Sequence, residues 1–258
     1  MSKMFTNERR EKILEILREK KRVTVKELAE KLEVSEATLR SDLNAMEKDK
    51  QLTRTHGGAT IEQKKVKTEN TFSERKRKNQ EEKRKIGLKA YEIIESGQCI
   101  ILDASSTALE LARILKESSM RLTVITNGIA SAMELKENPN LTVILLGGLL
   151  RVGSIGVEGV MGASLLKQIN VDIMFTSAKG FTIDDGLTDF NVYEVELKKL
   201  MKNASKQVVA LLDYSKMGNV SISPFASTEE VDTIITDSQA SKEILEQLKK
   251  TPINVITC

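Results

Sequence analysis

The sequence predicts an α/β protein in two parts. A winged helix-turn-helix occupies residues 1–61, a mainly parallel α/β sheet domain occupies residues 86–258, and a basic linker over residues 62–85 joins them. Three observations predict this fold class. The 258 residues are enough for two domains of ordinary size. The N-terminal part shows three short helical patterns and a Gly-Gly turn, whereas the rest alternates Val/Ile/Leu-rich strands with helical patterns.

Composition and charge restrict the class of protein further. Apolar residues make up 40% of the chain, as in folded proteins, and no apolar stretch approaches the roughly 18 residues of a membrane span. Cys99 and Cys258 cannot form a disulfide framework, and the N-terminus shows no secretory signal. We therefore expect a soluble, cytoplasmic protein with no membrane partner.

The distribution of charge is uneven along the chain. The formal charge is +3 over residues 1–60, +6 over residues 61–90 and −6 over the remainder. A basic front followed by an acidic rear favours a polyanion as the partner of the front. A solvated charged surface would explain the same distribution equally well.

Three amphipathic segments begin the chain. Residues 6–20 form the first predicted helix. A capping box from Thr24 to Glu27 begins the second helix, and Ser35 caps the third. The buried face of the third helix is predicted from apolar residues at i, i+4 and i+7, namely Leu39, Leu43 and Met46.

The opposite face of the third helix presents short polar side chains and one arginine. These are Glu36, Ala37, Thr38, Arg40, Ser41 and Asn44. Such side chains can read base edges and phosphates in a major groove, and the helix order fits helix-turn-helix docking. A three-helix bundle with no role in DNA binding would show the same periodicity.

A hairpin directly after this helix favours the DNA-binding interpretation. Residues 52–56 and 59–61 flank Gly57-Gly58, which is a two-residue turn signal. The hairpin would form a wing whose Arg54 and His56 could contact backbone or minor groove. His56 alone carries little weight, since a histidine in a surface turn is common.

The rear domain is predicted from short apolar runs that alternate with helical patterns. The predicted strands are residues 99–102, 122–125, 141–146, 171–175, 207–212, 233–236 and 254–257. Near-continuous Val/Ile/Leu runs indicate strands buried on both faces, and hence a mainly parallel sheet covered by helices.

Polar loops follow five consecutive strands of this sheet. The carboxyl ends of strands border the ligand crevice in open α/β sheets. Ser105, Ser106 and Thr107 would lie at a helix N-terminus, where free N–H groups favour an anion such as phosphate, and Lys179 and Lys216 would add positive charge. We expect a small phosphorylated ligand at this edge, although any one such loop is most often only a cap and a turn.

Several other kinds of site are disfavoured. The chain has no G-x-x-x-x-G-K-[ST] and no G-x-G-x-x-G motif, so nucleotide binding is poorly supported. One histidine and two distant cysteines give no metal-ligand cluster. A serine nucleophile would need a base, and the single histidine lies in the other domain. We therefore expect no metal, no cofactor and no catalytic residue.

Three separated motifs at the front resemble the DeoR family of bacterial transcriptional regulators. They are Arg10 and Leu14, then Ser35-x-x-Thr38-Leu39-Arg40-Ser41-Asp42-Leu43, and then Arg54-x-His56-Gly57-Gly58-Ala59. They occur in the family's order and at its spacing. Ser41 departs from the family, which usually has a second basic residue there. The resemblance implies binding to double-stranded operator DNA.

The resemblance extends over the rear and so covers nearly the whole chain. The motifs are Asp103-Ala-Ser-Ser-Thr107, Thr126-Asn127, Gly147-Gly148, Asp213-x-Ser215-Lys216, and Gly186-Leu187-Thr188-Asp189 followed by Asn191, Glu194 and Lys198. They are similar to the family's effector domain, which is related in fold to ribose-5-phosphate isomerase and binds phosphorylated sugar intermediates. Two departures, Ala104 and Ser177-Ala178-Lys179-Gly180, are similar to regulators of rhamnose-type deoxy-sugar catabolism.

The candidate site residues fall into two sets. For DNA they are Thr24, Ser35, Glu36, Ala37, Thr38, Arg40, Ser41, Asn44, Arg54 and His56. For the effector they are Asp103, Ser105, Ser106, Thr107, Thr126, Asn127, Gly147, Gly148, Lys179, Asp189, Glu194 and Lys216.

We expect a sequence-specific transcriptional regulator, a repressor of a sugar catabolic operon that a phosphorylated sugar releases from DNA. A dimer or tetramer is expected, because one winged helix contacts too little DNA for tight binding. The main alternative is a sugar-phosphate isomerase with an appended helical domain, in which Asp103, Asp189 or Glu194 would move the proton. RNA binding is a third possibility, set back by the wing and the scarcity of aromatic residues.

Overall fold

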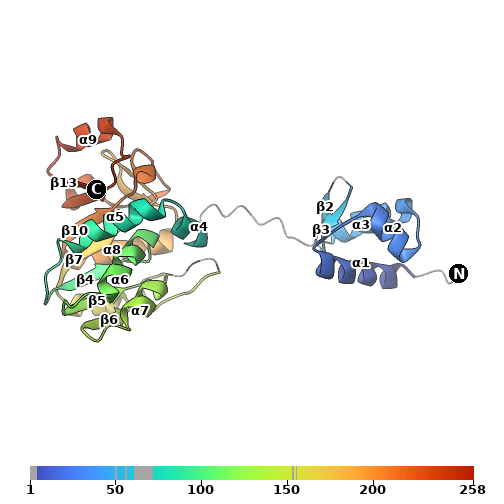
Figure 1. The fold of residues 1–258 in the computed structure, drawn as a ribbon, viewed down its shortest axis with the longest axis horizontal. Helices are drawn as coiled ribbons and strands as arrows, with labels where there is room; N and C mark the ends of the chain where they lie inside the picture. Colours follow the sequence, from blue (N-terminus) through green and yellow to red (C-terminus); the bar gives the residue numbers. More distant parts are fainter. Residues whose placement is uncertain (1–4, 50, 56, 61–71, 153, 155) are drawn as a thin grey trace. The chain divides into compact units, whose positions relative to one another are not determined.

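The computed structural model describes residues 5–49, 51–55, 57–60, 72–152, 154 and 156–258. Packing contacts divide the chain into two units, residues 1–69 and residues 70–258, which we call the front unit and the rear unit (Figure 1). Within the described residues, no helix is long and apolar enough to cross a membrane.

Three helices form the front unit. They are α1 (Thr6–Lys20), α2 (Val25–Leu32) and α3 (Glu36–Lys48), as the sequence predicts. The capping box at Thr24 and Glu27 is present, and the Ser35 hydroxyl accepts a hydrogen bond from the Thr38 N–H group. Ile13, Leu28 and residues of α3 form one buried cluster, which fixes the three helices against one another.

A small antiparallel sheet completes the front unit. Its strands are β1 (Arg22–Thr24), β2 (Thr53–Thr55) and β3 (Gly58–Thr60), in the order β1-β3-β2. Gly58 is required by close packing, because a Cβ atom there would lie 2.0 Å from the Val23 carbonyl oxygen. The hairpin of β2 and β3 directly follows α3, so the predicted wing is confirmed.

Seven parallel strands form the main sheet of the rear unit. They are β4 (Cys99–Leu102), β5 (Leu122–Thr126), β6 (Leu141–Leu145), β7 (Val171–Thr176), β10 (Ser205–Leu211), β12 (Thr233–Thr236) and β13 (Asn254–Thr257). The strand order is β13-β12-β10-β7-β4-β5-β6. The chain therefore moves outward in both directions from the β4–β7 pair, which is the switch point where open α/β sheets bind ligands.

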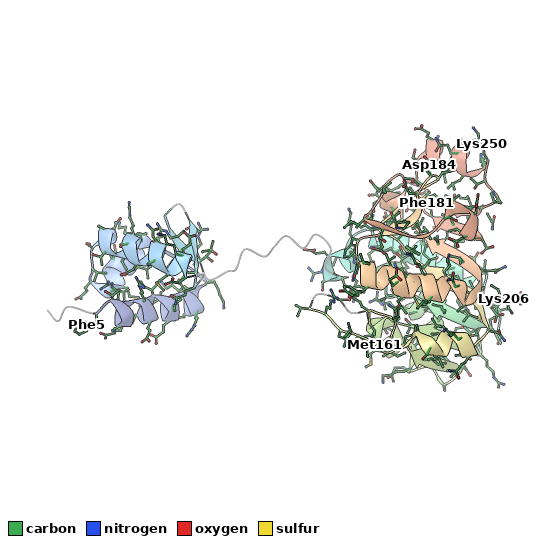
Figure 2. All side chains as sticks on the ribbon, turned by 180° about the vertical axis from the view of Figure 1, so that it is seen from behind. Phe5, Met161, Phe181, Asp184, Lys206 and Lys250 are labelled. Carbon is green, nitrogen blue, oxygen red and sulfur yellow. The ribbon has the colours of Figure 1, made fainter. Side chains whose placement is uncertain are left out.

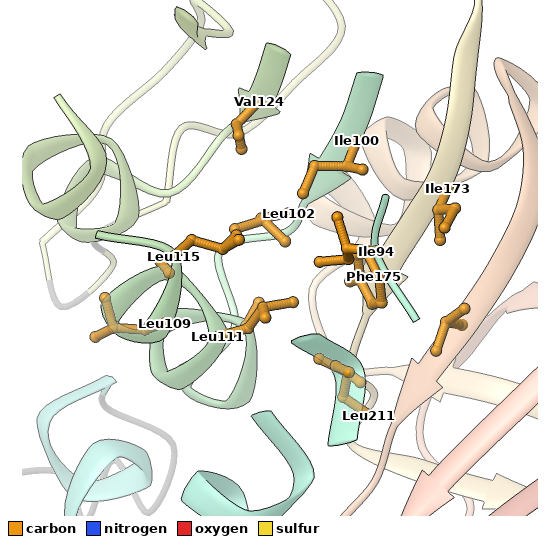
Figure 3. Packing of buried hydrophobic residues seen from close by; sticks show 14 of the residues in the cluster. Ile94, Ile100, Leu102, Leu109, Leu111, Leu115, Val124, Ile173, Phe175 and Leu211 are labelled. Carbon is orange, nitrogen blue, oxygen red and sulfur yellow. The ribbon is translucent and has the colours of Figure 1, made fainter. Parts of the chain in front are cut away.

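Helices cover both faces of this sheet. They are α5 (Gln80–Tyr91), α6 (Ser106–Lys116), α7 (Ile129–Leu135), α8 (Val192–Asn203) and α9 (Lys242–Leu248). Ile100 and Leu102 pack with Leu111 and Leu115 of α6 (Figure 3), whereas Ile101 packs on the other face with residues of α8 and the 3₁₀ helix Ala163–Gln168. Strands buried on both faces explain their continuous apolar runs.

A second, antiparallel sheet is absent from the sequence expectations. It contains β8 (Gly180–Thr182), β9 (Gly186–Asp189) and β11 (Ser223–Ala226), in the order β11-β9-β8. Phe181 of β8 is fully buried within the rear unit (Figure 2). Gly186 makes the β8–β9 turn at φ +66°, and a Cβ atom there would meet the Ala226 carbonyl oxygen at 2.1 Å. Two short 3₁₀ helices, Tyr214–Lys216 and Thr228–Glu230, flank β11 in the sequence.

The linker expected over residues 62–85 ends earlier than the sequence indicates. α4 (Phe72–Arg77) and α5 both begin before residue 86, and α5 lies beside α6 (Figure 1). The basic composition suggested a solvated segment, but Phe72 and Lys83 are buried in the rear unit. Residues 61–71 lie outside the described residues.

Candidate functional site

A pocket opens at the carboxyl ends of β4 and β7. Residues from six separate segments line it. They are Arg75, Ser105, Ser106, Thr107, Ser177, Ala178, Lys179, Asp189, Phe190, Lys198 and Lys216. Six of the twelve predicted effector residues are among them, namely Ser105, Ser106, Thr107, Lys179, Asp189 and Lys216. The switch point of the sheet thus brings together residues that lie far apart in the sequence.

The N-terminus of α6 forms one wall of the pocket. Ser105 is the N-cap, and its hydroxyl accepts a hydrogen bond from the Ala108 N–H group at 3.1 Å. The N–H groups of Ser106 and Thr107 have no partner within the helix, because they belong to its first turn. This wall therefore presents backbone donors and the positive end of the helix dipole to any bound group.

Asp103 lies beneath the pocket and not on its lining. Its carboxylate is fully buried and accepts hydrogen bonds from the Thr176 hydroxyl at 2.7 Å and from the Ser105 and Ser177 N–H groups. These bonds join the loops that follow β4 and β7. The position of Asp103 indicates that it orients the pocket walls, where the sequence suggested a direct ligand contact.

Lys198 is a buried cation among three buried carboxylates. Its Nζ atom lies 2.7 Å from Asp189, 3.3 Å from Asp103 and 3.5 Å from Glu194, and it also donates to the Ser177 carbonyl. Burial by itself lowers the pKa of Lys198, but the three carboxylates outweigh it and raise the pKa above its ordinary value. Lys198 is therefore charged at neutral pH. Burial also raises the pKa of Glu194, against the opposing effect of Lys198.

Three further cations reach the pocket from different elements: Arg75 from α4, Lys179 from the loop after β7 and Lys216 from the turn after β10. Burial lowers the pKa of Lys216, and the nearby Lys179 and Arg75 lower it further against the opposing effect of Asp213. A bound anion would favour the charged form of Lys216, which its surroundings disfavour.

Five predicted effector residues besides Asp103 do not line the pocket. Thr126 and Asn127 are buried after β5, where the Thr126 hydroxyl accepts from the Gly128 N–H group and the Asn127 amide donates to the Val157 carbonyl. Gly147 and Gly148 follow β6, and Gly148 packs closely on the Glu158 carbonyl. Glu194 faces Lys198. Val157 also donates its N–H group to the Asn127 carbonyl, so the loop around Val157 is bonded to the chain after β5.

The chemistry of the pocket walls does not suit a metal ion. In the part of the chain that the structure describes, no three His, Cys, Asp or Glu side chains gather as metal ligands would. The carboxylates that come together are those that already surround Lys198.

The exposed face of α3 is the candidate surface for DNA. Glu36, Ala37, Arg40, Ser41 and Asn44 are exposed, and Thr38 is half-buried, as the helical period predicts. The Arg40 guanidinium pairs with the Glu36 carboxylate at 3.1 Å on this face. An exposed pair of this kind contributes little stability, so Arg40 can exchange its partner for a phosphate or a base.

The remaining candidates for DNA are mostly engaged within the fold. The Thr24 hydroxyl belongs to the capping box, and the Ser35 hydroxyl lies 2.9 Å from that of Thr38. Arg54 donates to the Gly58 carbonyl across the hairpin at 3.0 Å, which holds its side chain along the wing. His56 lies outside the described residues.

Five lining residues and one buried ion pair are absent from the candidate set. Ser177, Ala178 and Lys198 belong to the quoted motifs but were not chosen, and Arg75 and Phe190 were not singled out at all. Arg75 and Phe190 line the pocket, but Arg75 fell inside the expected linker. The signal for α4 was Phe72, a single aromatic residue in an otherwise polar stretch. In the front unit, Arg9 donates to the buried Asp42 at 2.6 Å and ties α1 to α3.

Comparisons with known proteins match both units of the chain. Residues 9–65 match the DeoR-like helix-turn-helix domain, and residues 78–238 match the DeoR C-terminal sensor domain. The HTH-type transcriptional regulator GolR of Listeria innocua is 45% identical over 95% of this chain and 96% of its own. The glycerol-3-phosphate regulon repressor of Escherichia coli K12 is 29% identical over 99% of this chain and 100% of its own.

Among solved structures, ribose 5-phosphate isomerase A from Methanocaldococcus jannaschii is similar to the chain at 19% identity. The TM-score is 0.40, and the likeness covers 54% of this chain and 55% of that one.

Proposed function

We propose that this chain, which belongs to the DeoR family of transcriptional regulators, represses its target genes until a phosphorylated sugar enters the pocket of the rear unit. The family identifies a DNA-binding regulator. The repressor role and the phosphorylated effector are our inference. The observation that carries the effector is the gathering of Arg75, Lys179 and Lys216 around the N-terminus of α6.

A phosphate fits this arrangement better than a neutral group does. Hydrogen bonds to a charged group contribute about 1.5–3 kcal/mol each, roughly twice the value for neutral pairs. The first-turn N–H groups of α6 supply donors that a phosphate accepts, and the cations balance its charge. The carboxylates nearby do not oppose an anion strongly, because Lys198 neutralises part of their charge.

A small sugar suits the rest of the lining. The hydroxyls of Ser105, Ser106 and Ser177 can bond to sugar hydroxyls, and Phe190 offers one apolar face. The Escherichia coli relative is a repressor of the glycerol-3-phosphate regulon, and glycerol 3-phosphate is a phosphorylated polyol. This supports the class of effector and not its identity.

Regulation requires that the effector bind two arrangements of the protein unequally. Only a difference in affinity between the DNA-competent and DNA-incompetent states can shift the population between them. We further propose that the rear unit forms the homo-oligomer, since one winged helix spans a single half-site and paired half-sites need two-fold symmetry.

An isomerase activity is not supported by the site. A general base must have a carboxylate oxygen available to the substrate proton. Asp103, Asp189 and Glu194 all face Lys198, and Asp103 also accepts three hydrogen bonds from its own loops. The matched domains are those of regulators.

Calorimetry with matched pairs of sugars tests the proposal. Glycerol 3-phosphate and a panel of pentose and hexose monophosphates would be compared with the same compounds lacking phosphate. We expect a monophosphate to bind, and Thr107→Ala and Lys216→Ala each to weaken its binding by roughly 10- to 100-fold. Operator binding without effector should persist in both variants, because neither residue lies in the front unit.

The control is Lys206→Ala. Lys206 lies at the opposite, amino-terminal end of β10, where its side chain is exposed and pairs with Asp172 (Figure 2). The Lys206→Ala substitution removes one positive charge away from the pocket and should leave effector binding unchanged. Equal affinity for a sugar and its phosphate, or normal binding by Lys216→Ala, would contradict the proposal.

A further inference from the structure

Helix α4 brings a cation to the pocket from the segment nearest the front unit in sequence. α4 spans Phe72–Arg77 and is the first described element of the rear unit. Its Arg75 lines the pocket together with the N-terminus of α6 and Lys216. Any ligand that contacts Arg75 therefore contacts the chain close to residue 71, where the segment leading from the front unit ends.

Arg75 is held in the pocket by weak contacts. Its guanidinium lies 5.7 Å from the centre of the Phe72 ring and 5.8 Å from that of Phe190. Its buried Nε atom has no hydrogen-bond partner among the described residues. A buried guanidinium N–H group without a partner is costly, so the arrangement favours an acceptor that enters the pocket.

The other end of α4 is anchored to the pocket by two further side chains. The buried Lys83 of α5 donates to the carbonyls of Arg75 and Lys78, which lie at and just after the end of α4. Asn79, at φ +52°, donates to the Asp213 carboxylate at 2.8 Å, and Asp213 begins the turn that carries Lys216. α4 and the Lys216 turn are thus connected on the side away from the linker.

The length of α4 makes its order depend on such contacts. Six residues are far fewer than the roughly 12–15 that a helix needs to be stable alone in water. Phe72 is buried at its N-terminal end, α4 packs against α6, and Asn79 just beyond α4 bonds to Asp213; within α4 itself, Arg75 is the residue that lines the pocket.

We propose that Arg75 binds the anionic part of the effector and that this contact orders α4, so that the helix reports occupancy of the pocket to the segment leading to the front unit. The proposal rests on the proposed function for the chemical class of the ligand, a phosphate monoester. A planar guanidinium can bond a phosphate through two parallel N–H groups, which fixes orientation as well as charge. The unpartnered Nε of Arg75 is one of these donors.

Inorganic phosphate is the probe, because it contains the shared chemistry and no sugar. Phosphate binding would be followed by NMR titration of the full chain, and ordering of α4 by hydrogen exchange over residues 72–77. We expect phosphate to slow exchange in α4 of the wild type. Arg75→Ala should weaken phosphate binding by roughly 10- to 100-fold and abolish the slowing. Arg75→Lys keeps the charge but loses the two-donor geometry, so it should be intermediate.

Arg77→Ala is the matched control. Arg77 is exposed on the same helix, and its replacement by alanine removes the same charge. The variant should therefore behave as the wild type in both measurements. Hydrogen exchange over α5 and α6 shows whether each variant remains folded. If Arg75→Ala is unfolded, Arg75→Lys is used in its place to test the role of Arg75. If Lys216→Ala no longer binds phosphate while Arg75→Ala and Arg75→Lys still bind it, the role given to Arg75 is wrong. The proposed phosphate site in the pocket would then still hold. If the wild type binds neither phosphate nor any monophosphate, both proposals fail.

Discussion

Lys198 has more carboxylate neighbours than it can neutralise. One buried ammonium group faces Asp103, Asp189 and Glu194, and it also lies 4.9 Å from the centre of the Phe225 ring. Taking charged groups out of water costs several kcal/mol per ion, which their mutual attraction must offset. Lys198 therefore has a structural role, because it is the cation that offsets the charge of this buried acidic cluster.

Replacement of Lys198 by methionine should destabilise the rear unit by about 3–5 kcal/mol near neutral pH, since it leaves buried carboxylates without a cation. The pKa of Glu194 is already raised by burial and should rise further in the variant. Between the ordinary pKa of Glu194 and its raised pKa, the folded variant binds more protons than the unfolded chain. The free energy of unfolding of the variant therefore increases as the pH falls through this range. The loss should shrink between about pH 7 and about pH 5.

Chemical unfolding of the full chain followed by circular dichroism measures this loss. Lys199→Met, at the neighbouring half-buried position, should cost little, and Lys198→Met combined with Glu194→Gln should recover part of the stability. A loss that stayed constant over the pH range would mean that packing, and not charge, explains the role of Lys198.

At the scale of elements, the sequence predicts the long-range architecture better than its details. All seven strands of the parallel sheet lie where apolar runs predict them, within two residues at each end, because strands buried on both faces need continuous Val, Ile and Leu. The antiparallel sheet was missed because β8, β9 and β11 have three or four residues each and contain Gly, Pro and Asp. No period can be recognised over so few positions.

The lining residues that come directly after strands could be predicted from the sequence. Those that tertiary packing brings to the pocket could not. Ser105 to Thr107, Lys179 and Lys216 lie directly after strands, so the carboxyl-edge rule found them. Arg75 could not be found that way, because α4 reaches the pocket through the burial of Phe72. Burial of Lys83 runs against the usual exposure of lysine, which made the same stretch look like a solvated linker.

We propose that α3 is the recognition helix, so that its exposed face determines how the front unit reads DNA. We expect Arg40→Ala to weaken operator binding and Thr38→Ala to change base preference. A lost two-donor base contact costs about 1–3 kcal/mol on the specific sequence only, whereas a lost phosphate contact weakens all sequences and lowers the salt slope by about one.

Gel shifts on operator and random DNA at two salt concentrations distinguish the two outcomes. Lys12→Ala, on α1, is a control for the loss of one exposed charge. The Thr38 hydroxyl also lies 2.9 Å from that of Ser35, so the helicity of each variant must be measured first. If both variants were folded and bound operator as the wild type does, α3 would not be the DNA-reading helix.

At the scale of the whole molecule, each unit has its own core. The buried cluster of the front unit extends from Ile13 to Ala59, whereas the three clusters of the rear unit begin at Phe72. The described residues of each unit therefore satisfy their own packing, and the front unit contains a complete winged helix-turn-helix.

Truncation after Ile61 should leave a folded front unit that binds operator at least tenfold more weakly than the full chain. The expected loss follows from the proposed oligomerisation through the rear unit, because a single winged helix then replaces a linked pair. Fluorescence anisotropy gives the affinity, and analytical ultracentrifugation gives the mass of both proteins. Equal affinity of the truncated and full chains would refute the role given to oligomerisation.

Separate cores also affect how such a regulator can evolve. A change that repacks Leu43 has no neighbour in the rear unit's clusters to disturb, and a change near Phe175 has none in the front unit's. Mutations that alter operator specificity can therefore accumulate independently of mutations that alter effector specificity. Recombination between related genes, at the codons for residues 61–71, would replace the whole front unit by that of a relative and leave both cores intact. A new pairing of signal and target gene then needs one crossover, and selection need only refine the short segment that joins the two.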